Sequence, residues 1–296
     1  MDIEIANRLV QTLQEFIDQT AQYINQYSIY PEDGSPGSIE LESFSRRESV
    51  HTAHSLGTTL IEAAADHSMA MAKTLTEPVQ AFAPWICLRS VLESSALSYW
   101  IMDIDISVRV RVQRGFALRY KGLRQQEKIA RAMNDIVYLN RITKRMDQVE
   151  QDALQLGYDR VLSKNDNRIG IAIQMPPLTD IVRDTLNAES VYRYLSAITH
   201  AHHWAIRQVG FQEVDEKRVG ITTLPNTRIM EKGLLASSVV DLCQSATIFL
   251  SIPLWQKSCL FGWDLVQLDR LYTSIFKSMS IREAHHRWTA ENEDKK

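Results

Sequence analysis

The sequence predicts an all-α protein, a single-domain bundle of about eight or nine helices. Apolar residues recur at spacings of three and four along almost the whole chain, which is the period of an amphipathic helix and not of a strand. Glycine is sparse, with 11 among 296 residues, and no repeat period or convincing strand pattern appears. We therefore expect one helical domain over residues 1–288, followed by a disordered polar tail over residues 289–296.

Turn signals divide the domain into its expected helices. The turn-rich segment 30–37 ends the first helix, Pro84 kinks the third helix or marks its start, and Pro253 closes the eighth. The polar segment 158–177 lacks a helical period and is expected to be a long mobile loop, and residues 211–224 an irregular loop or minor hairpin. The expected helices span residues 3–27, 46–75, 78–102, 108–134, 136–156, 178–186, 189–209, 227–252 and 263–279.

Composition indicates an intracellular protein that needs no disulfide or metal to hold its core. Its three cysteines are scattered within apolar segments, which is typical of reduced thiols. The acidic start of the chain lacks the basic segment and apolar core of a secretory signal. The longest apolar run, residues 233–254, contains Asp241 and Gln244, so we expect a buried core helix and no membrane contact. These features favour a cytoplasmic location.

The formal net charge of −3 conceals a strongly basic segment. From Arg109 to Arg145 eight arginines and three lysines accompany only two acidic residues, so this segment carries +9 and the rest of the chain −12. Five of these cations share one side of the helix expected over residues 108–134, which predicts contacts with RNA phosphates. The alternative is an ordinary solvated face, neutralised by acidic neighbours or a partner subunit. The candidate RNA-binding residues are Arg114, Lys121, Arg124, Lys128 and Arg131.

The helix expected over residues 189–209 carries the most suggestive set of polar side chains. Arg193 and His200 are seven residues apart, which places them within about 20° of each other around a helix and about 10.5 Å apart along its axis. Ser196 lies between them on the same face. A guanidinium can stabilise a phosphorane and an imidazole can move a proton, so Arg193, His200 and Ser196 are the candidate catalytic residues.

This string resembles the HEPN superfamily of bacterial all-helical proteins, whose nuclease members carry an Arg-x(4–6)-His motif on a late helix. Arg193-x6-His200 has the longest of these spacings. The chain also resembles uncharacterised bacterial helical proteins that combine a Tyr-x-x-Leu-Ser-x-x-x-His string, here Tyr192 to His200, with an earlier Arg-x-x-x-Glu, here Arg89 to Glu93. The resemblance covers these two helices. It implies an RNA-acting protein, a metal-independent endoribonuclease of toxin or defence type, working as a homodimer with its active groove between the subunits.

Two other functions remain open. In the first, the protein is a non-catalytic interaction module with a protein partner, and Arg193, His200 and Glu93 form a structural network with Arg89. In the second, two histidine pairs at i,i+3 lie on facing helices and bind a metal in a bundle enzyme. Because a closed metal site demands more ligands than these pairs supply, we expect no cofactor and no stoichiometric metal. The histidines concerned are His51, His54, His200 and His203.

Motifs for several other kinds of chemistry are missing from the sequence. It contains no phosphate-binding GxxxxGK[ST] loop, no GxGxxG, no GxSxG and no HExxH. Their absence argues against nucleotide-driven, hydride-transfer, serine-hydrolase and zinc-protease activities.

Overall fold

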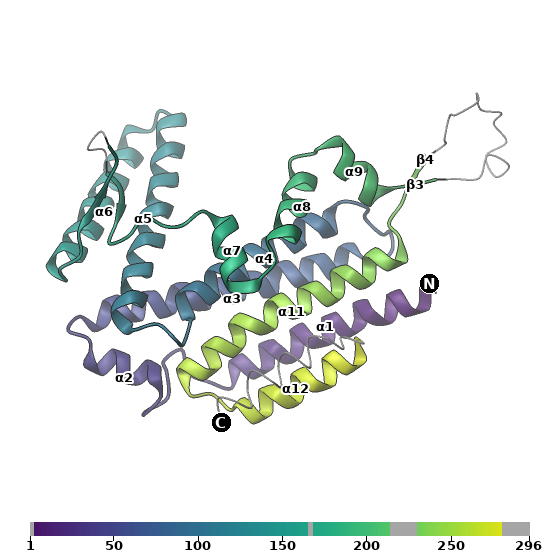
Figure 1. Ribbon diagram of the computed structural model, residues 1–296, viewed down its shortest axis with the longest axis horizontal. Helices are drawn as coiled ribbons and strands as arrows, with labels where there is room; N and C mark the ends of the chain where they lie inside the picture. Colours follow the sequence, from purple (N-terminus) through teal and green to yellow (C-terminus); the bar gives the residue numbers. More distant parts are fainter. Residues whose placement is uncertain (1–2, 165–167, 214–229, 280–296) are drawn as a thin grey trace.

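The computed structural model describes residues 3–164, 168–213 and 230–279. Within these ranges the chain forms eleven helices and two short antiparallel strand pairs (Figure 1). The all-α prediction is confirmed, although the helix count of the described part exceeds the expected eight or nine. The predicted tail over residues 289–296 lies outside the described ranges.

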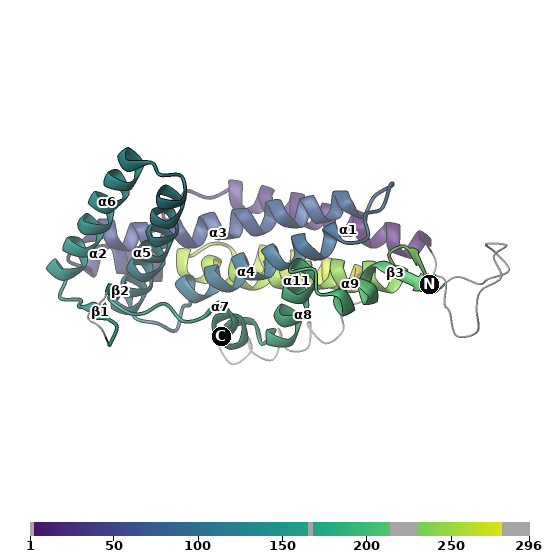
Figure 2. The same ribbon diagram turned by 90° about the horizontal axis from the view of Figure 1, so that it is seen from above.

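Long helices packed side by side form the main body of the molecule (Figures 1 and 2). Helices α3 and α4 approach most closely where α3 has Gly57, because a side chain there would collide with Met102. Ser98 of α4 donates a hydrogen bond to the Gly57 carbonyl at 2.9 Å. The main body consists of α1 (Ile3–Asn25), α3 (Arg47–Thr74), α4 (Ala83–Met102), α11 (Ala236–Phe261) and α12 (Leu265–Ser278).

Helix α11 lies between α1, α3 and α4 and supplies much of the core. Among the described residues it is the helix whose length and apolar composition would allow it to span a membrane, over Ser237–Phe261. Its buried side chains include Leu242, Leu250 and Leu254, which fits the expected core helix. The helix runs through Pro253, so the prediction that this proline closes it is wrong. The free energy gained by burying α11 on several sides outweighs the roughly 3 kcal/mol that a proline inside a helix costs.

A second group of elements stands at one end of the long bundle (Figure 1). These elements enclose a separate apolar cluster that includes Phe116, Tyr120 and Ile142. Local capping residues set their starts: the side chains of Ser107 and Asp135 accept backbone N–H bonds from the first turns of α5 and α6. The group comprises α2 (Pro36–Ser43), α5 (Val108–Ala132), α6 (Ile136–Gln155) and the paired strands β1 (Arg160–Leu162) and β2 (Arg168–Ile171).

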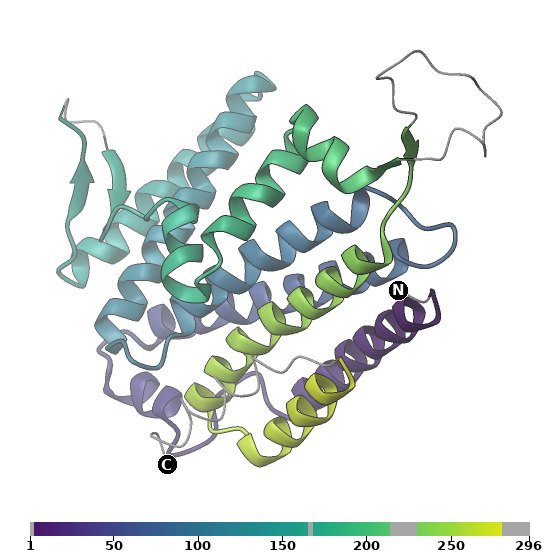
Figure 3. The same cartoon turned by 45° about the vertical axis from the view of Figure 1, so that its right-hand side comes forward.

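Two short helices, α7 and α8, pack along α4, and a third, α9, follows α8 (Figure 3). Helix α7 ends at Asn187, whose φ of 49° reverses the chain into α8. Beyond α9 the chain enters a strand pair. These elements are α7 (Leu178–Leu186), α8 (Glu189–Thr199), α9 (His203–Gly210), β3 (Phe211–Glu213) and β4 (Met230–Lys232).

Four further local predictions are corrected by the structure. Helix α2 begins inside the segment expected to be a turn, because Ser35 caps it and Pro36 fits its first turn. Segment 158–177 contains the β1–β2 pair in place of a structureless loop. Phe211–Glu213 pairs with Met230–Lys232, and the rest of the predicted segment 211–224 lies outside the described residues. The helix after Met230–Lys232 begins at Ala236 and not near residue 227. The helix expected over residues 189–209 is divided into α8 and α9.

Candidate functional site

The two strings that carry the family resemblance meet where α8 packs on α4. Arg89 Nε donates to Glu93 Oε1 at 2.8 Å, and the Arg89 guanidinium lies 5.5 Å from the centre of the Tyr192 ring. Burial opposes the charge on Arg89, but the Glu93 carboxylate and then the Tyr192 hydroxyl outweigh burial and raise the pKa of Arg89. Arg89 is thus the cationic partner expected for Glu93, and Tyr192 links this pair to α8.

Arg193 lies on the solvent side of α8. Its Nη2 lies 2.7 Å from Glu189 Oε1 in an i,i+4 pair, and its side chain is 67% exposed. Exposed ion pairs of this kind contribute only about 0.3–0.5 kcal/mol to stability. An anionic ligand can therefore replace the Glu189 carboxylate with little loss of free energy. The predicted grouping of Arg193 with Glu93 is not what the structure shows, because Arg193 bonds to Glu189 and Glu93 to Arg89.

Helix α8 ends at Thr199, and His200 is its C-terminal cap. The backbone N–H of His200 still donates to the Ser196 carbonyl at 3.0 Å, so His200 follows the last turn of α8. Ala201 then adopts φ = 53°, a left-handed conformation that turns the chain into α9. An alanine at this position gives no turn signal, which is why a continuous helix was expected. Arg193 and Ser196 thus lie on α8, and His200 follows at its C-terminal cap, about two turns after Arg193.

Exposed rings gather at the turn between α8 and α9, residues 200–204, which we call the elbow. The side chains of His200, His202 and His203 are exposed, and Trp204 is 56% exposed. The Trp204 ring centre lies 5.9 Å from that of Tyr194, whose own ring packs edge-on against Trp85 of α4. The elbow therefore presents imidazole and indole rings to solvent, and the Trp204 ring is supported by Tyr194, which in turn packs on Trp85.

The basic helix α5 is less free to bind phosphates than its sequence suggests. Arg114 turns inward, where it donates to the Trp100 carbonyl, lies 5.1 Å from the Trp100 ring centre and pairs with Asp103 at 3.6 Å. Arg124 and Arg131 both bond to the carboxylate of Glu127, at 3.3 and 2.8 Å. Of the five predicted RNA-binding residues, Lys128 and Arg131 are exposed, and Lys121 and Arg124 are half-buried. The five cations share one face on a helical wheel, but they differ in the structure. One is directed inward and two are paired with an acidic residue of the same helix.

The two histidine pairs are not brought together. His54 is buried, and its Nε2 lies 3.0 Å from Glu40 Oε2. His51 packs its ring 5.2 Å from that of Tyr30, while His200 and His203 lie exposed on the elbow. The described residues contain no group of three or more histidine, cysteine or acidic side chains arranged to hold a metal ion. The structure therefore gives no geometric support to the predicted metal-dependent alternative.

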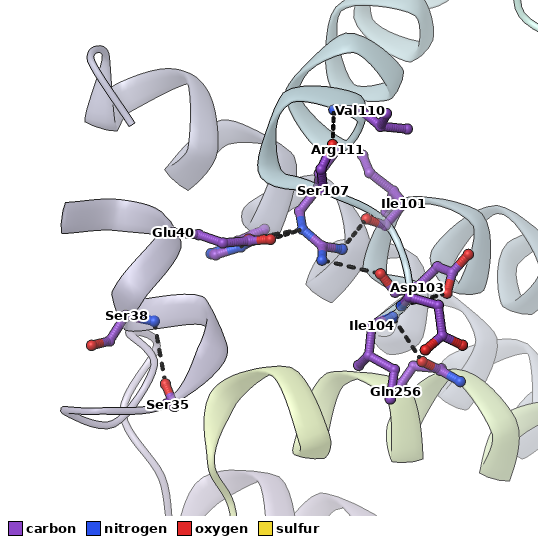
Figure 4. A network of polar contacts seen from close by, with 12 residues as sticks. Ser35, Ser38, Glu40, Ile101, Asp103, Ile104, Ser107, Val110, Arg111 and Gln256 are labelled. Atoms are coloured by element: carbon purple, nitrogen blue, oxygen red, sulfur yellow. Dashed lines mark hydrogen bonds and ion pairs between the residues drawn. The ribbon is translucent and has the colours of Figure 1, made fainter. Parts of the chain in front are cut away.

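A polar cluster that the sequence did not predict, Glu40–His54–Arg111, lies between α2, α3 and α5. Arg111 Nε donates to both Glu40 carboxylate oxygens, and its two terminal nitrogens donate to the carbonyls of Ile101 and Asp103 at 2.7 and 3.0 Å (Figure 4). The Ser35–Pro36 helix start could have revealed the helix that carries Glu40. Nothing in the residue spacing distinguishes Arg111 from the other cations of its helix.

The electrostatics of this cluster keep its carboxylate charged and its imidazole neutral. Burial raises the pKa of Glu40, but hydrogen bonds from His54 and then Arg111 outweigh it and lower the pKa below its usual range. Burial lowers the pKa of His54 in spite of the Glu40 carboxylate. Because the cluster is buried and joins α2, α3 and α5, its arrangement suits the stability of the fold and not contact with a substrate.

A small open cleft of about 360 Å³ lies beside the N-terminus of α5, far along the chain from the elbow. Its main cationic group, Arg109, already donates to the carbonyls of Leu156 and Gly157 and lies 4.7 Å from the centre of the Tyr158 ring. Gln113 likewise donates to the Ala172 carbonyl at 2.9 Å. These side chains donate to backbone carbonyls next to the β1–β2 pair, so they are already in use within the protein. The elbow is therefore the better candidate site.

Comparison of the chain with models of protein families, with curated proteins and with solved structures finds no match. The function proposed below therefore rests on the residues and geometry of the site.

Proposed function

We propose that the protein binds single-stranded RNA at the elbow and cleaves it as a metal-independent endoribonuclease of toxin or defence type. The observation that carries the proposal is the exposure of Arg193 on α8 and of His200 at the C-terminal cap of the same helix, next to the exposed rings of the elbow. Unpaired bases stack on aromatic and imidazole rings, and a guanidinium binds phosphate. Side chains placed in this way support a contact with an unpaired, phosphate-bearing chain.

The chemistry assigned to the site needs one cation and one proton carrier. The ribose 2′-oxygen attacks the adjacent phosphorus, and the bond from phosphorus to the 5′-oxygen breaks, which leaves a 2′,3′-cyclic phosphate and a free 5′-hydroxyl. His200 accepts the 2′-hydroxyl proton as the attack begins, and the 5′-oxygen takes a proton from solvent water as it leaves. His200 then gives its proton to the hydroxide left by that water, which restores the neutral imidazole. Arg193 exchanges Glu189 for the phosphate and stabilises the charge that develops on its oxygens. Ser196, one turn before His200, can donate a hydrogen bond to the same phosphate.

We assign RNA contact to the elbow and not to α5. Arg114 is directed inward and Lys121 is half-buried, so the five cations do not form the continuous exposed stripe that phosphates would follow. The homodimer implied by the family resemblance stays part of the proposal, and the exposed elbow leaves room for a second subunit beside it.

The test is cleavage of a 5′-labelled single-stranded RNA in the presence of EDTA, with binding measured separately. His200→Ala should abolish cleavage and leave the Kd for RNA within about threefold, because its role is proton transfer. Trp204→Ala should instead weaken binding, by an amount that corresponds to the loss of about 1–3 kcal/mol of stacking. His51→Ala, which alters a histidine remote in sequence from the elbow, is the matched control and should retain both activities. Wild-type protein that neither binds nor cleaves RNA would overturn the proposal.

A non-catalytic interaction module is the second candidate. It is favoured by the local pairing of Arg193 with Glu189, which gives that guanidinium a partner without any substrate. RNA binding that survives in His200→Ala, with no cleavage by the wild type, would support this candidate over the nuclease.

A further inference from the structure

Three large apolar side chains are exposed at the turn between α5 and α6. Met133 is the C-terminal cap of α5, and Ile136 and Val137 are the first two residues of α6. Their exposed fractions are 66%, 65% and 76%. We call these three residues the tip patch. The α5–α6 hairpin rises away from the long bundle, so the patch lies at the end of a projection (Figures 1 and 2).

The tip patch is one surface because of where its residues stand in the two helices. Every residue from 131 to 137 is exposed, and only two residues separate Met133 from Ile136. Side chains tilt toward the N-terminus of their helix, so Ile136 and Val137 lean toward the free end of the hairpin. Ile129, which is 52% exposed, lies one turn before Met133 on the same side of α5 and extends the apolar surface. A contiguous exposed apolar group marks an interaction surface.

Cations surround the tip patch. Residues 128–145 contain five exposed arginines and lysines and one acidic residue, so this end of the hairpin carries +4. The acidic residue, Asp135, uses its carboxylate to accept a hydrogen bond from the Tyr138 N–H at the start of α6. Three of the cations lie within five residues of the tip patch, which is about 7.5 Å along a helix. The five cations are Lys128, Arg131, Arg141, Lys144 and Arg145.

We infer that the tip patch docks on the surface of a bilayer that contains anionic phospholipids. Apolar side chains at such a surface enter the boundary between headgroups and acyl chains, about 5–10 Å deep. The nearest cations stand no more than about 7.5 Å behind the tip, so they reach the charged headgroups as the patch enters. The apolar end and its positive rim thus match the two layers that they meet.

The distribution of charge orients the approach to such a surface. The segment from Arg109 to Arg145 carries +9 and the rest of the chain −12. An anionic surface attracts the hairpin and repels the rest of the molecule, so the protein approaches with the tip forward. Because salt screens charges beyond a Debye length, this attraction should weaken as the salt concentration rises.

Two other occupants fit the tip less well. RNA phosphates would neutralise the cations but would leave the apolar side chains uncovered. A protein partner would need an apolar groove shaped to a convex end, and residues 128–145 offer no exposed aromatic side chain of the kind that dominates specific protein interfaces. A bilayer adapts to the shape of the tip and covers both its charged and its apolar parts.

This contact involves the surface of a membrane and no spanning helix. The expectation of no membrane contact rests on the apolar run 233–254, and the tip patch changes it for the membrane surface alone. The contact uses neither Arg193 nor His200, so it holds or fails independently of the RNA activity.

The experiment is co-sedimentation of the full chain with vesicles of phosphatidylcholine alone or of three parts phosphatidylcholine to one part phosphatidylserine. Wild type should bind the anionic vesicles at least about tenfold more tightly and should dissociate from them as salt is added. Lys128→Glu/Arg141→Glu should weaken this binding at least about tenfold, because two attractive charges become repulsive. Ile136→Gln/Val137→Gln leaves the charge unchanged and should weaken binding by a similar factor, because less apolar surface enters the bilayer.

Matched changes on α12 control for general effects of charge and polarity. Arg270→Glu/Lys277→Glu reverses two exposed cations and should leave vesicle binding unchanged. Val266 is the second residue of α12 and 61% exposed, as Val137 is the second residue of α6, so Val266→Gln should also bind like the wild type. Every altered side chain is exposed, so each variant should unfold at the temperature of the wild type.

Failure of the wild type to bind the anionic vesicles would overturn the inference. Binding that survives in Ile136→Gln/Val137→Gln would overturn it too, since the cations alone would then account for the attraction. If the wild type ignores vesicles while Lys128→Glu/Arg141→Glu weakens its RNA binding, the surface belongs to RNA and not to lipid. If the wild type ignores vesicles and the glutamine variant has a lower mass in solution, the patch is instead a contact between protein chains.

Discussion

The Glu40–His54–Arg111 cluster and the elbow contain similar residue types in opposite settings. Arg111 is fully buried, and three of its nitrogens bond to Glu40, Ile101 and Asp103. Arg193 has a single carboxylate partner and is 67% exposed. His54 is held against Glu40 inside the protein, whereas His200 ends a helix in solvent.

The difference shows how burial assigns roles to polar residues. A guanidinium removed from water must have all its donors satisfied, so Arg111 is committed to the three helices that it joins. A guanidinium in water can exchange partners at little cost, so Arg193 remains available to a ligand. Changes in the buried cluster should therefore affect stability most, and changes in the elbow should affect function.

The largest expected effect is that of Arg111→Ala. The change leaves the Glu40 carboxylate with only His54, and it removes the donor from the buried Ile101 carbonyl and the partly buried Asp103 carbonyl. We expect a loss of about 3–5 kcal/mol in the free energy of unfolding, measured with urea. Arg124→Ala, which removes an arginine that is 44% exposed on the same helix, should cost less than about 1 kcal/mol. If the two variants lost equal free energy of unfolding, burial would not explain the different roles of these arginines.

Lys257→Met should stabilise the protein at neutral pH. Burial lowers the pKa of Lys257 to about 8 from 10.5, with Trp263 and Phe261 as its ring neighbours. Between these pH values the unfolded chain binds the extra proton, so wild-type stability rises with pH through this window. At pH 7 the variant should gain up to about 3 kcal/mol, and its unfolding free energy should lack that rise. A less stable variant would show that the ring contacts outweigh burial.

His54→Gln should remove a pH dependence that begins near neutrality. Because burial lowers the pKa of folded His54 below 6.5, the unfolded chain binds more protons, and wild-type stability falls as the pH drops below about 6.5. The lowered pKa of Glu40 adds a separate loss below about 4.5. The variant should lose about 1 kcal/mol of unfolding free energy at pH 7. Between about pH 4.5 and 6.5 its unfolding free energy should change less with pH than that of the wild type. His200→Gln, the matched change in the elbow, should unfold at pH 7 like the wild type.

The smallest effect on stability is expected for Arg193→Gln. It removes one exposed i,i+4 pair with Glu189, so the free energy of unfolding should change by no more than about 0.5 kcal/mol. RNA cleavage should nevertheless fall by orders of magnitude if the proposed role is right. A variant that cleaves RNA like the wild type would remove Arg193 from the catalytic assignment.

Much of the helical content was predictable because it depends on local patterns. The expected bounds of α7 agree with the structure, and those of α3, α5 and α6 differ by at most two residues at either end. Apolar periodicity and capping residues such as Ser107 and Asp135 act within one or two turns, so they can be read directly from the sequence. The Arg89–Glu93 pair was predictable for the same reason, since its members are one turn apart.

The sequence by itself determined the helical class, most helix limits and the placement of Arg193 and Ser196 on one helix. Only the tertiary structure decided the continuation of α11 through Pro253, the inward turn of Arg114 and the burial of Arg111 against Glu40. Each of these depends on a partner distant in the sequence, such as Glu40, 71 residues from Arg111. Whether a polar side chain binds inside the protein or stays free for a ligand is set by which elements pack over it, and local spacing does not encode that packing.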